Sequence, residues 1–222
     1  MSKAAIFSKI RKGLGRQEAT AEQRAAVAKR LNEHPCATIP ARGQGDAAHQ
    51  CSVFKAMALE ASAEIIELTP NDNLAKHIGQ RLAQQGITEL VSASDSELAK
   101  LDWSIAPELS VQNRVAQVGD RASLTLAFAG IAETGTLMLH SRSESPTTLN
   151  FLPDLHLVVL RTSQIVGYYE QAWQLIRDAF GPDMPRTVNM ITGPSRSADI
   201  EQRLQMGAHG PKELVILLIN DQ

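Results

Sequence analysis

Aromatic residues are scarce in this chain. Only 4% of its 222 residues are Phe, Trp or Tyr, whereas 43% are hydrophobic and 21% are charged. The core must therefore consist mostly of aliphatic side chains. This composition suits helices layered on a Val/Ile/Leu sheet better than an aromatic-rich β-sandwich, and the length is sufficient for one sizeable core.

Cysteine is almost absent as well. Cys36 and Cys51 are the only two, and no CxxC or CxxxC spacing occurs. A four-thiolate iron–sulfur site cannot be assembled from this chain alone, and a single pair in a chain of this size is not a disulfide framework. We therefore expect a cytoplasmic protein with no metal or redox cofactor of its own.

Long apolar runs and an excess of one charge are also missing. No apolar stretch approaches the ~20 residues that a membrane span requires, and the formal net charge is -2. Since nucleic-acid and acidic-membrane partners attract basic proteins, this balance gives no reason to expect either. We predict no membrane span and no nucleic-acid partner.

The N-terminal residues predict a helical extension. Residues 1–16 are basic, and Ile6, Ile10 and Leu14 recur every four residues, which favours an amphipathic helix over a transit peptide. A second helix is predicted over 21–32, followed by a linker rich in Pro and Gly. We predict a helical extension over residues 1–45 and an α/β domain over residues 46–222.

Helical and strand patterns alternate at short intervals beyond the extension. This alternation predicts parallel strand pairing with right-handed crossovers, and hence a three-layer α/β fold with a mostly parallel or mixed central sheet. The last strand is apolar throughout, which predicts a central, buried position. The predicted helices cover residues 47–63, 74–82, 94–101, 163–180 and 197–206, and the predicted strands cover 64–68, 88–91, 114–118, 123–131, 136–140, 155–160, 187–191 and 214–219.

One candidate turn joins two strand-like segments and contains Glu133, Thr134, Gly135 and Thr136. Gly135 indicates a backbone that bends or closely approaches another segment. A carboxylate in an apolar hairpin needs solvent or a partner, because burying it unpaired is costly. Glu133 is the candidate catalytic residue, as a general base, nucleophile or acceptor for a ligand hydroxyl; the alternative is a solvated hairpin residue.

A second candidate turn begins at Gly193, at the carboxyl end of a predicted strand, where open α/β sheets bind ligands. Backbone N–H groups with Ser195 and Arg196 could hold a phosphate or carboxylate. Asp199 and Glu201 either complement the dipole of the predicted helix or bind ligand hydroxyls. The alternative is an N-capped helix after a tight Gly-Pro turn. Neither a Walker loop nor GxGxxG is present.

Two histidines complete the candidate ligand-binding set. His156 begins a predicted strand, and His209 precedes Gly210 in a loop of fixed shape. Either could act as an acid–base or anion-binding group, or be structural. No third ligand has a local spacing, so no metal site is predicted. A Ser195–His209–Asp199 triad lacks the supporting GxSxG elbow.

Four blocks of sequence together resemble one known family. They occur in a fixed order: AETGTL at 132–137, LPDLH at 152–156, GPSRSADIE at 193–201 and GAHGP at 207–211. One block alone is a weak signal, whereas four in this order are specific. The chain resembles the lactate-utilisation protein C family, the small LUD-domain proteins, over most of its length, with a looser match in the first hundred residues.

This resemblance implies a fold like that of the ribose-5-phosphate isomerase, glucosamine-6-phosphate deaminase and CoA-transferase superfamily. It implies a role in the oxidation of L-lactate to pyruvate, together with two iron–sulfur partner proteins, one of which carries its own LUD domain. The chain would be the cluster-free subunit, in agreement with its two cysteines, and would bind a small anionic metabolite.

Two further functions remain open. Glu133-Thr134-Gly135 is similar to the Glu-x-Gly turn that supplies the CoA-transferase nucleophile. The chain would then be a stand-alone enzyme on a phosphorylated or CoA-linked metabolite, using Glu133 with Ser195 and Arg196. The other reading is an interaction module without catalytic residues. The sequence leaves open whether the chain is an enzyme.

Overall fold

The computed structural model describes the backbone of residues 2–36, 38–200, 203–206 and 209–222. Within it the chain forms two compact units, Met1–Thr38 and Ile39–Gln222. The first unit holds two helices, α1 (Lys3–Gly13) and α2 (Ala21–Glu33). Both predicted N-terminal helices are therefore present, while the domain boundary at residue 45 stays a prediction.

Side-chain caps explain where these two helices begin. The Ser2 hydroxyl accepts a hydrogen bond from the Ala5 N–H, and so occupies one of the donors left free in the first turn of α1. Thr20 and Gln23 form a reciprocal capping box at the start of α2.

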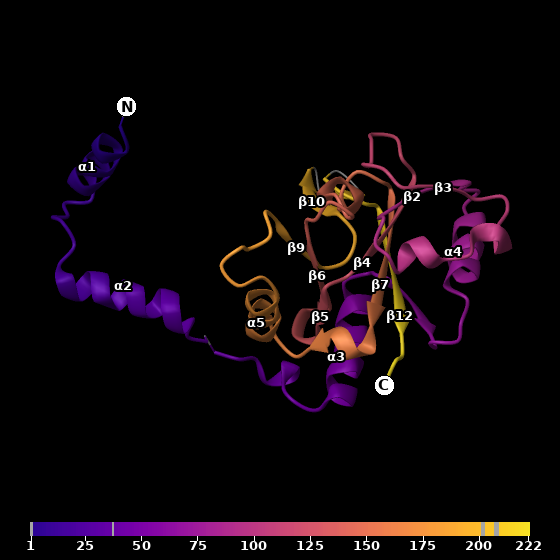
Figure 1. Cartoon of the computed structure of the whole chain (residues 1–222), viewed down its shortest axis with the longest axis horizontal. Coiled ribbons are helices and arrows are strands. Elements are labelled where there is room, and N and C mark those ends of the chain that lie inside the picture. Colours follow the sequence, from indigo (N-terminus) through magenta and orange to yellow (C-terminus); the bar gives the residue numbers. More distant parts are fainter. Residues whose placement is uncertain (1, 37, 201–202, 207–208) are drawn as a thin grey trace. The chain divides into compact units, whose positions relative to one another are not determined.

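A six-stranded, fully parallel sheet organises the second unit (Figure 1). Its last strand in sequence lies between the first and seventh strands, so the prediction of a central, buried position is confirmed. The strand order is β1 (Glu64–Leu68), β12 (Glu213–Ile219), β7 (Leu155–Arg161), β4 (Ala122–Leu126), β2 (Glu89–Ser92) and β3 (Ser110–Gln112).

Helices cover both faces of this sheet. Alternate residues of β7 enter two separate apolar clusters: Leu157 packs on the side of α4 (Leu74–Ala83) and Val158 on the side of α3 (Ala47–Glu60). Figure 1 shows the two helices on opposite sides of β7 and β12. The predicted three-layer α/β fold is confirmed, and the closer likeness to the isomerase and CoA-transferase superfamily stays a prediction.

A smaller mixed sheet holds the first candidate turn. Leu137 and Leu139 pack toward α3, and Met138 packs toward α5 (Tyr169–Phe180). The predicted turn between two strands is thus a hairpin that lies between two helices. The strands follow the order β8 (Ile165–Val166), β5 (Ala129–Ile131), β6 (Thr136–His140) and β9 (Val188–Ile191).

The predicted helix over 197–206 is wrong. The chain forms β10 (Arg196–Ile200) and β11 (Arg203–Met206), which pair as antiparallel strands. The Ala, Gln, Arg and Leu content of this segment favours a helix, but such propensities are weak and pairing between strands overrides them. Consequently Arg196 and Asp199 lie in a hairpin strand, not in the first turn of a helix; Glu201 lies outside the described residues.

Other predicted elements are shorter than expected. The helix predicted over 163–180 begins only at Tyr169, after a short strand, and 94–101 contributes a single 3-10 turn. No strand forms over 114–118, a described segment whose polar residues pair locally: Arg114 binds Asp120. The 3-10 helices are Ala41–Gly43, Leu98–Lys100, Trp103–Ile105, Ala132–Thr134, Thr147–Asn150 and Thr162–Gln164.

Two glycines bring the candidate turns against α3 and its C-cap residue, Ala61. Gly135 has φ +63°, and a Cβ there would lie 2.2 Å from the Ala58 nitrogen. Gly193 has φ +68°, and its Cβ would lie 2.1 Å from the Ala61 carbonyl oxygen. Real Cβ atoms do not approach backbone so closely, and positive φ disfavours other residues. The close approach predicted for Gly135 is confirmed.

We therefore expect Gly135→Ala to destabilise the protein far more than Gly86→Ala. Gly86 has φ +60° but open space around its Cβ position, so its substitution carries only the cost of the left-handed backbone, about 1–2 kcal/mol. Displacing α3 should add about 1–3 kcal/mol at Gly135. Urea unfolding measures both variants, and equal losses would contradict the proposed backbone contact.

Candidate functional site

The Glu133 carboxylate is buried and satisfied by a helix end. Its side chain is only 4% exposed, and Oε1 accepts a hydrogen bond of 3.1 Å from the N–H of Tyr169, the first residue of α5. A carboxylate at this position complements the positive end of the helix dipole. Glu133 therefore anchors α5 to the hairpin; the catalytic role predicted for it stays a prediction.

Four hydroxyl groups meet beside Glu133, and we call Thr134, Thr136, Tyr169 and Thr192 the hydroxyl cluster. Thr136 Oγ1 lies 2.6 Å from both Thr134 Oγ1 and Thr192 Oγ1 and 3.0 Å from the Tyr169 hydroxyl. Because Thr192 immediately precedes Gly193, the cluster joins the first candidate turn to the second. Thr136 is buried and Thr192 is exposed, so the cluster extends from the interior to the surface.

His156 lies in the core and not in either turn. It is fully buried on β7, with Nε2 2.8 Å from Thr125 Oγ1. Burial lowers the pKa of His156 to about 3, because the charged imidazolium is disfavoured in an apolar environment. The ring is therefore neutral at physiological pH and hydrogen-bonds between two neighbouring strands, which is a structural arrangement.

Ser195 contacts the backbone of the segment that contains His209. The Ser195 N–H donates to the Pro211 carbonyl at 2.8 Å, and the Ser195 hydroxyl accepts from the His209 N–H at 3.3 Å. A Cβ on Gly210 would lie 3.3 Å from the Ser195 Cβ. The structure thus brings Ser195, His209 and Gly210 together as two packed loops, and the bond to Ser195 comes from backbone, not from the imidazole that a triad would use.

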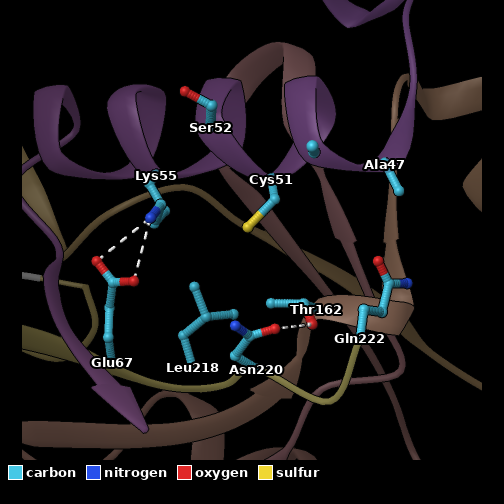
Figure 2. Close-up of a pocket in the computed structure, with 10 residues that line it drawn as sticks. Ala47, Cys51, Ser52, Lys55, Glu67, Thr162, Leu218, Asn220 and Gln222 are labelled. Atoms are coloured by element: carbon cyan, nitrogen blue, oxygen red, sulfur yellow. Dashed lines mark hydrogen bonds and ion pairs between the residues drawn. The ribbon is translucent and has the colours of Figure 1, made fainter. Parts of the chain in front are cut away.

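A pocket of about 330 Å³ lies at the carboxyl ends of the central strands, beneath the N-terminal half of α3 (Figure 2). We call it the strand-end pocket. This edge of the sheet is where open α/β folds bind ligands, and the volume is at the lower end of ligand sites. Its walls combine small, polar and charged groups from Ala47, Ala48, Cys51, Ser52, Lys55, Glu67, Thr162, Leu218, Asn220 and Gln222.

The chemistry of the strand-end pocket depends on Lys55. Figure 2 shows its ammonium directed from α3 toward Glu67, and Nζ lies 3.1 and 3.3 Å from the two carboxylate oxygens. Burial raises the pKa of the Cys51 thiol, so this thiol is protonated at neutral pH and is not an activated nucleophile. A cation beside hydroxyl, amide and thiol groups is suited to holding a small polar anion.

The sequence analysis missed the residues of this pocket. Glu67 and Asn220 stand at the carboxyl ends of two predicted strands, and parallel strands end at the same edge. Cys51 and Lys55 are four residues apart, on one face of a predicted helix. The ends of predicted parallel strands were therefore the available signal, but motif spacing directed attention to the Gly-containing turns.

The residues that the structure describes form neither a metal-binding cluster nor a membrane-spanning helix. Within those residues, no group of three or more His, Cys, Asp or Glu side chains is arranged to hold a metal ion. None of the helices described there is long and apolar enough to cross a membrane.

Comparisons with known proteins converge on one family. The family model described as "LUD domain" matches residues 46–219. A Lactate utilization protein C of Geobacillus thermodenitrificans is 29% identical, over 88% of this chain and 94% of that protein. A second, from Geobacillus kaustophilus, is 36% identical over 52% of this chain and 49% of that protein.

A solved structure shows the same fold. The crystal structure of a DUF162 family protein from Deinococcus radiodurans superposes with a TM-score of 0.60, at 19% sequence identity. The match covers 79% of this chain and 99% of that chain. At this level of identity the likeness concerns the fold alone.

His156 makes a pH dependence of stability predictable. Its folded-state pKa lies below the ordinary value of about 6.5. Between about pH 6.5 and 3 the unfolded chain binds a proton that the folded chain does not, so the free energy of unfolding falls as the pH falls, by up to about 1.4 kcal/mol per pH unit. Urea unfolding across this range measures the slope.

His156→Gln removes this titrating group, so the slope should fall by the contribution of one bound proton, up to about 1.4 kcal/mol per pH unit. This holds whatever the substitution does to stability at neutral pH. The matched control is His34→Asn, because His34 is exposed in the N-terminal unit and asparagine tolerates its left-handed backbone. An unchanged slope in His156→Gln would contradict the assignment of a neutral, buried histidine.

Proposed function

Because the chain belongs to the LUD domain family, we propose that it takes part in lactate utilisation. The observation that carries this proposal is the similarity to a Lactate utilization protein C across 94% of that protein's length. The match covers 88% of this chain, more than the 46–219 segment that the family model spans. It therefore supports a shared role as well as a shared fold.

The specific role proposed is that of the cluster-free subunit in the oxidation of L-lactate to pyruvate. This reaction releases two electrons and two protons from the C2–H and O–H bonds. The chain has two cysteines in total, fewer than a four-thiolate cluster needs. Two iron–sulfur partner proteins, which the family resemblance implies, would accept the electrons, and we propose that all three act in the cytoplasm.

The strand-end pocket is the proposed place for a small anionic metabolite. The Lys55 ammonium has three N–H donors, and the two carboxylate oxygens of Glu67 accept hydrogen bonds from it. At least one N–H can therefore still donate to a ligand carboxylate. The strand-end pocket has room for a small ligand, whereas the hydroxyl groups of the hydroxyl cluster are already hydrogen-bonded to one another. The Lys55 side chain is half-buried, and its ion pair with Glu67 positions the charge.

A second candidate function is favoured by the burial of Glu133. A carboxylate that is 4% exposed and adjoins the hydroxyl cluster is a plausible base or nucleophile. The chain would then act alone on a phosphorylated or CoA-linked metabolite. In that case the ligand would contact the turn residues Thr134, Gly135, Thr136, Gly193, Ser195 and Arg196, and Asp199, Glu201, His209 and Gly210 are the further ligand contacts that the sequence predicts.

Growth and copurification test the role in lactate utilisation. We expect deletion of the gene to abolish growth on L-lactate and leave growth on pyruvate unchanged, because only the oxidation step would be lost. The tagged full-length chain should copurify two iron–sulfur proteins from cells grown on L-lactate. Normal growth on L-lactate without the gene would refute the proposal. Normal growth of a strain that carries Glu133→Gln and Ser195→Ala would argue against a catalytic role of the turns.

Ligand-dependent unfolding separates the two candidate sites. L-Lactate or pyruvate at 100 times its Kd should stabilise the wild-type protein by about 2.7 kcal/mol, and Lys55→Gln should lose this effect. Glu133→Gln should keep it, and so should the control Glu67→Gln, which removes the ion pair and keeps the cation. If only Glu133→Gln loses the ligand-dependent stabilisation, the result would instead favour the turns as the binding site. If no anion stabilises the wild-type protein, the proposal that this chain binds an anionic ligand is wrong.

A further inference from the structure

Charge is distributed very unevenly along this chain. The first 16 residues contain five Lys or Arg and no Asp or Glu, whereas the remaining 206 contain 17 basic and 24 acidic residues. The formal net charge of -2 therefore conceals a strongly basic N-terminal segment attached to an acidic remainder. An argument from the net charge of the whole chain does not apply to this segment.

The same segment is an independently capped amphipathic helix. Ser2 starts α1, and Gly15, with φ +60°, follows its end. Ile6, Phe7, Ile10 and Leu14 fall within an arc of about 100° on a helix of 3.6 residues per turn. These four apolar side chains are between 45% and 62% exposed, so α1 presents an apolar stripe that the described structure leaves uncovered.

Most cations of α1 lie outside this stripe. On the same helical projection, Lys9 and Arg11 lie on opposite flanks of the apolar arc and Lys12 lies on the far face, whereas Lys3, in the first turn, falls within the arc. A groove in a partner protein contacts one face of a helix, and would leave the cations away from that face in water, where they add little to binding. A layer of anionic headgroups meets the cations on both flanks while the stripe enters the acyl boundary.

We propose that α1 is a peripheral membrane anchor that lies in the plane of an anionic lipid surface. Charge complementarity supports this occupant, because five cations and no acid in the first 16 residues match an anionic surface, which repels the acidic remainder of the chain. The anchoring is electrostatic and interfacial; α1, with 11 residues, is too short to span a bilayer. This inference is independent of the proposed role in lactate utilisation.

Vesicle binding by the full-length protein tests the anchor. We expect cosedimentation with vesicles of phosphatidylcholine plus phosphatidylglycerol and little with phosphatidylcholine alone, and the binding should weaken at high salt because charges are screened. Lys9→Gln with Lys12→Gln should reduce the partition coefficient roughly 25-fold, at about fivefold per cation. Ile10→Ser should also reduce it, because it removes apolar area from the stripe.

The matched control places the same charge change on the second helix. Lys29→Gln with Arg30→Gln removes two cations from α2, and should leave the partition coefficient nearly unchanged. An equal loss in this control would overturn the assignment to α1. Failure of the wild-type protein to bind anionic vesicles would overturn the proposal itself, and would leave an acidic protein surface as the partner of α1.

Discussion

The backbone of α3 is the constraint on which the rest of the α/β unit depends. This helix covers one face of the six-stranded sheet, and two turns from distant parts of the sequence touch its backbone through Gly135 and Gly193. Atoms at these contacts would be little more than 2 Å from any added Cβ. Since backbone cannot yield as a flexible side chain does, both positions require glycine, and the smaller sheet is fixed relative to the larger one.

This constraint explains why the two motif turns adjoin each other. Once both turns rest on α3, Thr136 and Thr192 are close enough to share a hydrogen bond, and Glu133 reaches the start of α5. The polar residues of the motifs therefore satisfy one another within a packed interface. Open volume with a cation lies elsewhere, at the carboxyl edge of the large sheet, where Lys55 and Glu67 meet.

Charged groups are treated differently in the interior and on the surface of this protein. In the interior, His156 is held neutral by burial and bonds to Thr125, which links two strands without introducing a charge. On the surface, the first 16 residues combine five cations and no acid with the apolar stripe of α1. The average composition of the chain describes neither region, because burial and sequence position decide what each charge contacts.

The sequence by itself determined the alternation of helices and strands, the central position of the apolar strand β12, the close approach at Gly135 and the family resemblance. These features depend on local periodicity or on one residue type. Only the tertiary structure decided that 196–200 and 203–206 pair as antiparallel strands, that His156 is internal, and that Lys55, Glu67 and Asn220 share a pocket. The last two results depend on contacts between residues far apart in the sequence, and local propensity carries no information about which distant segments meet. The pairing of 196–200 with 203–206 is local, but there strand pairing overrides a helix-favouring composition.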